Sequence, residues 1–383
     1  MTYKSVDQLQ KFLAEEVFSY TQDAKKASGR ALGTLVEIIT FYLFKAWGFE
    51  NSLAIERPLA EYGNPEITHN VEYSLHPFLN LAAVKLSTPL PLSSQKILKE
   101  LKDKNYPLNN YLRVDNTLLT TSKILRNSCV IANRNQPYLS YLMANLDSIE
   151  DNSFNITILE QLAKPYAMIE CKRVGVEEGT RKGPQTIEKA KQGAYVAKAV
   201  SSLQKTRLSS GELRGLIYKS GNKIYTKSYK DLVDEIVNSD ERDLIKDFIL
   251  TIGVVSNHGN WFTSENHNKE LKVLAQSYDW LLFLTDEGLT EFITEFLIEP
   301  NKILLPAKNA FLASYSAEKK KNAFTKVQMD YEADQVLQSF FKNKLGYISK
   351  WFNIITPRDV NIDNLHIQIT KLKNKHWEKI HIK

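Results

Sequence analysis

Two continuous apolar runs of strand length limit the fold more than any other feature of the sequence. Residues 248–255 read Phe-Ile-Leu-Thr-Ile-Gly-Val-Val and residues 280–284 read Trp-Leu-Leu-Phe-Leu, so neither run alternates apolar with polar side chains. A strand without such alternation is buried on both faces, which happens at the centre of a sheet that helices cover from both sides. We therefore expect an α/β fold with a mixed central β-sheet flanked by helices.

A long helix is predicted ahead of these strands, at residues 31–47, and Gly48 ends it. Its apolar residues recur at helical spacing, so one broad stripe of the helix should be buried. Glu37 lies beside that stripe. Residues 51–76 are predicted to form short strands or extended arms on the surface, and residues 308–383 are predicted to be mainly helical.

Length and composition indicate one folded core with elaborations. The chain has 383 residues, of which 43% are hydrophobic and 25% are charged, an ordinary balance for a globular protein. We expect the core within residues 1–300, interrupted by large, mainly helical insertions at about 51–127 and 205–247. Residues 301–383 would form a mainly helical C-terminal extension.

Charge and cysteine content bear on the partners and the compartment. Lysine and arginine exceed aspartate and glutamate by 50 − 44 = 6, which permits a polyanionic partner without requiring one. Cys129 and Cys171 are too few for a disulfide scaffold, and no stretch approaches the about 18 continuous apolar residues of a membrane span. These features predict a cytoplasmic protein without a membrane partner.

The most informative segment is predicted to be a pair of strands. Residues 154–159 alternate apolar and polar side chains as a half-buried strand does, residues 161–165 supply a turn, and residues 166–173 form a second strand. We therefore expect an antiparallel hairpin. Residues two apart in a strand share a face, so Glu170 and Lys172 should emerge side by side.

A carboxylate beside a lysine is the pairing that phosphodiester hydrolysis needs. Carboxylate oxygens hold Mg²⁺, which polarises the scissile phosphate and generates hydroxide. A lysine orients the attacking water or stabilises the developing charge. One carboxylate is not enough, so a second acidic ligand should come from the neighbouring strand of the hairpin, close to Glu170.

At this point the segment resembles the PD-(D/E)XK nuclease superfamily, in which an Asp near the start of one strand faces an acidic-X-Lys motif on the next. The resemblance is to type II restriction endonucleases in particular, and it rests on residues 169–175 and 182–192. It implies a restriction-endonuclease-like core and Mg²⁺-dependent, sequence-specific double-strand cleavage of DNA. It also implies a homodimer and a cognate DNA methyltransferase in the same system. The insertions and residues 301–383 would then serve base readout, DNA contact and dimerisation.

The sequence departs from this family at one position, because Asn155 stands where the metal-binding Asp is expected. Asn is nearly isosteric with Asp but neutral, so it should weaken Mg²⁺ binding. Three hypotheses remain open. Asn155 is an Asp-to-Asn change that inactivates the enzyme, or the true ligand is Asp151 or Asp147 a little upstream, or the natural protein binds DNA without cutting it.

Further candidates surround this motif. The opening helix of the superfamily often supplies an additional carboxylate, which implies a metal-shell or water-positioning role for Glu37; the alternative is a solvated or salt-bridged helix residue. Several basic and amide residues are candidates for contacts with DNA, with a solvated surface as the alternative. They are Arg30, Arg173, Arg181, Lys182, Gln185, Lys189 and Gln192.

Three functions from two classes therefore compete. The leading hypothesis is a type II restriction endonuclease, present here in an inactive form if Asn155 replaces the metal-binding Asp. The alternatives are a structure-selective repair or defence nuclease with the same chemistry, and a non-cleaving DNA-binding module. Large insertions favour restriction, because reading several base pairs requires about 1,000–2,500 Å² of protein surface.

Overall fold

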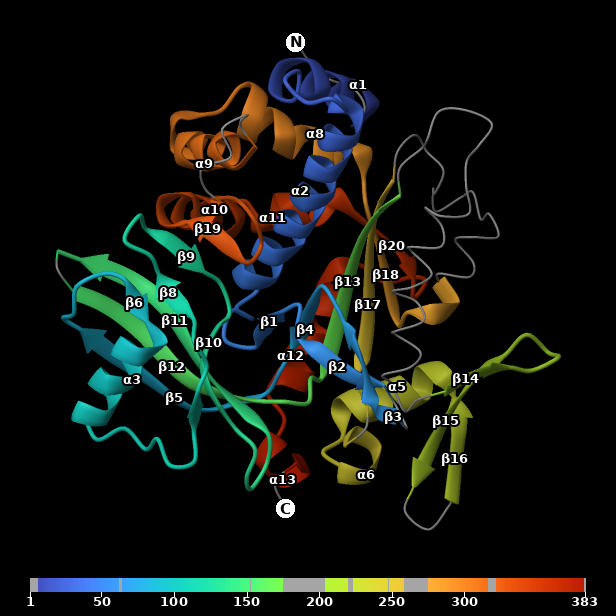
Figure 1. The fold of residues 1–383 in the computed structure, drawn as a ribbon. Helices are drawn as coiled ribbons and strands as arrows, with labels where there is room; N and C mark the ends of the chain where they lie inside the picture. Colours follow the sequence, from blue (N-terminus) through green and yellow to red (C-terminus); the bar gives the residue numbers. More distant parts are fainter. Residues whose placement is uncertain are drawn as a thin grey trace.

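A mixed six-stranded sheet forms the centre of the protein (Figure 1). The computed structural model describes residues 6–61, 64–151, 153–174, 204–219, 223–246, 248–257, 275–315 and 322–381. The strands of the central sheet, in spatial order, are β1 (Leu53–Ile55), β4 (Tyr73–Leu75), β13 (Ala167–Val174), β17 (Leu250–Asn257), β18 (Trp280–Leu284) and β20 (Phe352–Thr356). The three middle strands run parallel, and each of the others runs antiparallel to its neighbour. The α/β class with a mixed sheet is therefore confirmed.

The middle strands are buried on both faces, as their apolar runs predict. Ile252 and Val254 of β17 belong to one large hydrophobic cluster, whereas Val255 belongs to a second cluster with Leu281 and Tyr278. Successive residues of β17 thus contribute to different clusters, because side chains alternate between the faces of a strand.

Helix α2 (Ala24–Ala46) covers the face of the large cluster and lies beside β13 in Figure 1. It contains most of the helix predicted at residues 31–47, and it begins earlier because Asp23 accepts a hydrogen bond from the backbone N–H of Lys26, at 2.9 Å. It also packs against α10 (Tyr331–Asn343), where the Tyr42 hydroxyl donates to Asp334 at 2.8 Å.

A second, antiparallel sheet of five strands is inserted between β4 and β13 of the central sheet. Its spatial order is β5 (Phe78–Leu86), β12 (Ser153–Leu162), β11 (Ser140–Glu150), β10 (Cys129–Arg134) and β7 (Leu112–Arg113). Helix α3 (Ser94–Asp103) packs against it, and the two share a hydrophobic core of their own. This sheet lies to the left of the central sheet in Figure 1.

Three small sheets and short helices complete the described structure. The sheets are β19 (Gln328–Asp330), β9 (Ile124–Arg126), β8 (Thr117–Leu119) and β6 (Leu92–Ser93); β14 (Gln204–Arg207), β15 (Leu213–Lys219) and β16 (Lys223–Ser228); and β2 (Pro58–Glu61) with β3 (Asn64–Asn70). The further helices are α1 (Val6–Phe12), α5 (Tyr229–Asn238), α6 (Arg242–Ile245), α8 (Asp286–Ile293), α9 (Leu305–Tyr315), α11 (Leu345–Ile348), α12 (Ile362–Lys373) and α13 (Trp377–His381).

The structure of the elaborations departs from the expectations in three respects. The insertions at 51–127 and 205–247 consist largely of strands in their described parts, because alternating segments pair with one another into sheets. Leu53 and Tyr73 are buried in the central sheet and not on the surface. The extension from residue 301 is mainly helical, as predicted, but it also supplies β20 to the central sheet. In the part of the chain that the structure describes, no helix combines the length and apolarity needed to cross a membrane.

Candidate active site

Glu170 lies in the middle of β13 with a relative exposure of 7%. Its neighbours Ile169 and Cys171 belong to the cluster under α2, whereas Met168 belongs to the cluster on the other face. Alternation along the strand therefore assigns Glu170 to the face of Met168, and the position of Lys172 to that same face. The side chain of Lys172 lies outside the described part of the structure.

Glu72 directly precedes β4, the antiparallel neighbour of β13, and lies next to Glu170. The register pairs Ile169 with Tyr73, so the next step along both strands brings Glu170 level with Glu72. The backbone N–H of Glu72 donates to Oε2 of Glu170 at 3.1 Å, and Glu72 itself is 9% exposed. The carboxylate of buried Glu170 thus bonds to the backbone of buried Glu72, at the residue where the chain enters β4.

A buried lysine from the C-terminal part of the chain joins this pair. Nζ of Lys326 contacts the carboxylate of Glu72, and it lies 2.9 Å from Oε1 of Glu56 and 3.3 Å from Oε2 of Glu37. Lys326 is 8% exposed, and its backbone carbonyl accepts a hydrogen bond from Nδ2 of Asn127 at 3.2 Å. We name Glu37, Glu56, Glu72 and Glu170 together with Lys326 the acidic cluster.

Two buried tyrosines lie beside members of the acidic cluster. The Tyr73 hydroxyl donates to the backbone carbonyl of Glu37 at 2.8 Å, and burial, followed by nearby acidic groups, raises the pKa of Tyr73 well above its ordinary value. Burial and then the charge of Glu170 likewise raise the pKa of Tyr278. Both phenols are therefore neutral across the physiological range and contribute no negative charge.

Gly253 on β17 is level with Glu170, and its missing side chain makes room for Tyr278. A Cβ at this position would stand 2.9 Å from the Tyr278 ring and 3.0 Å from Leu281. The ring can rest directly on the sheet next to Glu170 only because residue 253 is glycine. Tyr278 thereby covers one side of the carboxylate.

Asn155 lies in a different sheet from Glu170, so the predicted hairpin of 154–159 with 166–173 is wrong. β12, which carries Asn155, pairs with β11 on one edge and β5 on the other, while β13 pairs with β4 and β17. After β12 the chain turns, and the N–H of Tyr166 bonds to the carbonyl of Leu75, which aligns β13 with β4. Both edges of β12 are already occupied, and β13 finds its partners elsewhere.

The other acids near Asn155 also lie in the five-stranded sheet. Nδ2 of Asn155 donates to Oγ of Ser148 at 2.9 Å and to Oε1 of Glu150 at 2.8 Å. Asp151 occupies the turn between β11 and β12 with φ at +46°, and Asp147 accepts a hydrogen bond from Thr157 at 2.8 Å. The structure therefore does not bring Asn155, Asp151 or Asp147 together with Glu170.

The remaining predicted residues divide into two groups. Glu37 joins the acidic cluster through Lys326, whereas Arg30 is exposed near the start of α2. The side chain of Arg173 and the whole of Arg181, Lys182, Gln185, Lys189 and Gln192 lie outside the described residues.

Sequence reasoning missed Glu72, Glu56 and Lys326. Glu72 had a usable signal, because it directly precedes a short strand that is apolar enough to join the core. Lys326 lies in a loop ahead of β19 and had no local signal at all.

The donor set of the acidic cluster suits a hard divalent cation. Carboxylate oxygens are the ligands that Mg²⁺ prefers, and the Glu170 carboxylate lies at the backbone N–H of Glu72. Among the described residues, no three acidic, histidine or cysteine side chains already stand in a coordinating arrangement. The ammonium of Lys326 occupies the space that three of the carboxylates share.

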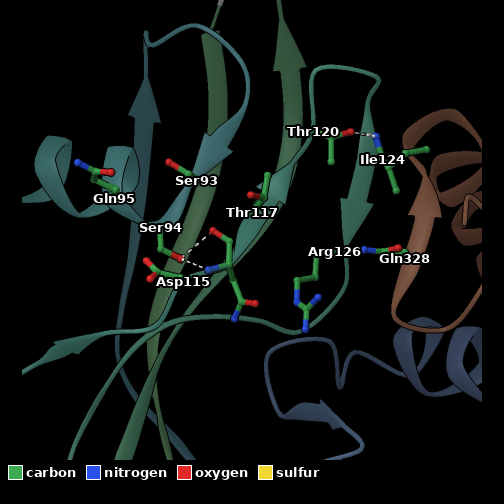
Figure 2. A pocket seen from close by; sticks show the side chains of 10 residues that line it. Ser93, Ser94, Gln95, Asp115, Thr117, Thr120, Ile124, Arg126 and Gln328 are labelled. Carbon is green, nitrogen blue, oxygen red and sulfur yellow. Dashed lines mark hydrogen bonds between the residues drawn. The ribbon is translucent and has the colours of Figure 1, made fainter. Parts of the chain in front are cut away.

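A polar pocket of about 480 Å³ lies on the four-stranded sheet of β19, β9, β8 and β6. Strand β19 of this sheet directly follows the loop that contains Lys326. Figure 2 shows its lining, with Ser94 and Thr117 on one side and Arg126 and Gln328 on the other. Arg126 of β9 pairs in register with Gln328 of β19, two residues beyond Lys326. The pocket wall and the acidic cluster are thus connected through one short loop.

Comparison of the chain with protein-family models finds no match, and comparisons with curated proteins and with solved structures find none that is significant.

Proposed function

We propose that the chain is a Mg²⁺-dependent type II restriction endonuclease whose core is of the PD-(D/E)XK kind, with Glu72 as the second acidic ligand. One observation carries this proposal: Glu72, the residue before the adjacent antiparallel strand β4, bonds through its backbone N–H to the Glu170 carboxylate, and Lys172 follows two residues after Glu170. This is the arrangement that the superfamily resemblance leads us to expect, supplied by a residue 98 positions upstream.

The chain's own residues have separate tasks in this proposal. Glu72 and Glu170 hold the cation, and the N–H of Glu72 fixes the orientation of the Glu170 carboxylate. Lys172 orients the attacking water or stabilises developing charge on the phosphate, and Tyr278 keeps water from one side of Glu170. A bound Mg²⁺ would polarise the phosphate and lower the pKa of a coordinated water.

Glu37 supports the same site from α2. Its carboxylate is 3.3 Å from Lys326, and Lys326 also contacts Glu72, so one ammonium brings the helix carboxylate towards the sheet. This matches the additional carboxylate that the opening helix of the superfamily often supplies. The proposal assigns Glu37 a role in the outer shell of the cation.

The partners are part of the same proposal. Double-stranded DNA is the substrate, the enzyme acts as a cytoplasmic homodimer, and a cognate methyltransferase protects the cell's own sites. The five-stranded sheet and the polar pocket of Figure 2 offer a surface with hydroxyl, amide and guanidinium groups, which can hydrogen-bond to bases and phosphates. That surface favours sequence-specific cleavage over a structure-selective repair or defence nuclease.

The hypothesis of a non-cleaving DNA-binding module loses its main support. It depended on Asn155 removing a charge from the metal site, and Asn155 lies in the five-stranded sheet. In the present proposal, Glu72 supplies the charge that the hypothesis took to be missing.

Incubation of the protein with supercoiled plasmid and Mg²⁺ tests the proposal. We expect discrete linear fragments from the natural chain and intact plasmid with Glu170→Gln or Lys172→Ala, while both variants stay folded and bind DNA. The surface variant Lys227→Ala, which removes an exposed partner of Glu235, should cut like the natural chain. Random nicking would favour a structure-selective nuclease, and cleavage by Glu170→Gln would refute the site.

A further inference from the structure

Lys326 occupies the position in the acidic cluster that a small cation would take. Its ammonium reaches carboxylate oxygens from three separate places in the fold, namely helix α2 (Glu37), the segment after β1 (Glu56) and the residue before β4 (Glu72). With 8% of its surface exposed, Lys326 is also among the most deeply buried lysines of the described residues. A buried ammonium of this kind compensates acidic groups that would otherwise repel one another.

A divalent cation bound by Glu72 would need the same oxygens that Lys326 now contacts. An ammonium and a divalent cation repel each other at such short separation, so both cannot use the Glu72 carboxylate at once. The long, flexible stem of lysine allows its head group to withdraw while the backbone of the loop stays in place. That backbone is held independently, because N–H and Nδ2 of Asn127 donate to the carbonyls of Val327 and Lys326 at 2.9 and 3.2 Å.

We infer that Lys326 is an internal counter-ion that competes with the divalent cation for Glu72, so that the cation binds only by displacing it. This inference rests on the proposed function, because it takes Glu72 to be a metal ligand. Lys326 is a positioning residue here: in the metal-free protein it holds Glu37, Glu56 and Glu72 together, and it weakens cation binding to the same site.

Mn²⁺ titration of the full chain by calorimetry, without DNA, tests the competition. Lys326→Met removes the charge and keeps a long stem, so the affinity for Mn²⁺ should rise by about tenfold or more. The melting temperature of this variant should fall in EDTA and recover with Mn²⁺. Lys326→Gln, which can still hydrogen-bond to the carboxylates, should show the same direction of change if Lys326→Met does not fold.

Lys45→Met is the matched control, because Lys45 also forms a largely buried pair, with Asp334 at 3.2 Å, but outside the acidic cluster. It should lower the melting temperature without changing the affinity for Mn²⁺. An unchanged or weaker affinity in Lys326→Met, with Glu72→Gln abolishing binding, would overturn the competition alone. Absence of Mn²⁺ binding in the natural chain and in every variant would overturn the proposed function together with this inference.

Discussion

The β11–β12 turn and the acidic cluster both gather carboxylates, and they differ in how the fold treats them. At the turn, Asp147, Glu150 and Asp151 lie within five consecutive residues, and all three are exposed. In the acidic cluster, Glu72 and Glu170 come from distant parts of the chain and are buried beside a buried lysine. Acids that are close in sequence thus remain on the surface, whereas acids distant in sequence meet inside.

Buried acidic side chains that come together from distant parts of the chain are therefore a better guide to a site than a high local density of charge. An exposed carboxylate costs the fold little and finds partners such as Lys85, which pairs with Glu150 at 2.8 Å. A buried group of carboxylates is costly to maintain, and such groups are concentrated at functional sites.

Neutralising one glutamate in each region should affect DNA cleavage in only one of the two cases. Glu72→Gln removes a charged ligand from the proposed metal site, and cleavage should fall by about 10²–10³-fold. Glu150→Gln makes the same chemical change at the exposed turn and should leave cleavage unaltered. Initial rates of plasmid cleavage at saturating Mg²⁺ measure both effects. Equal losses of activity in the two variants would show that the buried and the exposed glutamate do not differ in function.

Filling the space above Gly253 should destabilise the central sheet. The new Cβ of Gly253→Ala would meet the Tyr278 ring and Leu281 at 2.9 and 3.0 Å, which should lower the free energy of unfolding by about 1–3 kcal/mol. The matched change Gly33→Ala in α2 meets nothing within 4 Å and should stabilise the protein by about 0.5–1 kcal/mol. Urea denaturation measures both, and a neutral Gly253→Ala would show that Tyr278 does not rest tightly on the sheet.

The stability of the junction between the central sheet and the five-stranded sheet should decrease in acid. His76 follows β4, and its ring bonds to Ser74 at 2.7 Å and to the carbonyl of Leu162 at 2.8 Å. Burial, and then the charge of Arg57, lower the pKa of His76 well below 6.5. The unfolded chain therefore takes up the proton first as the pH falls.

Stability should accordingly be complete above pH 6.5 and decline below it, by up to about 1.4 kcal/mol per pH unit from His76 alone. Urea midpoints between pH 7.5 and 5.5 measure this decline. His76→Gln should be less stable at neutral pH and should lose this part of the pH dependence; an identical pH dependence in the variant would show that His76 is not its source.

Removing the Asn155 side chain should have the smallest effect. Asn155→Ala loses hydrogen bonds to Ser148 and Glu150 at a half-buried position, so the free energy of unfolding should fall by less than about 1 kcal/mol. Cleavage should remain at the level of the natural chain. A loss of activity comparable to that of Glu72→Gln would return Asn155 to the active site.

Sequence patterns predicted two central strands and the long helix, because the burial of each is visible in its own order of apolar and polar residues. The apolar runs at 248–255 and 280–284 became β17 and β18, and the helical stripe became α2, because burial on two faces or on one stripe leaves a direct imprint on residue order. The strand with Glu170 was predicted for the same reason.

The partner of Glu170 could not be predicted in the same way. Proximity in sequence favoured β12, but the antiparallel neighbour of β13 is β4, and the whole five-stranded sheet is inserted between β4 and β13. Strand pairing across so long an insertion depends on the packing of the complete core, which no short segment encodes. Lys326 was missed for a similar reason, since a loop residue acquires its role only from the elements that surround it.

The most direct test of Glu72 as the second acidic ligand compares the natural chain with Asn155→Asp on supercoiled plasmid in the presence of Mg²⁺. If Glu72 is the second acidic ligand, the natural chain already cuts the plasmid into discrete fragments, and Asn155→Asp changes neither their rate of formation nor their pattern. Intact plasmid with the natural chain and cleavage with Asn155→Asp would contradict the account and identify residue 155 as the ligand.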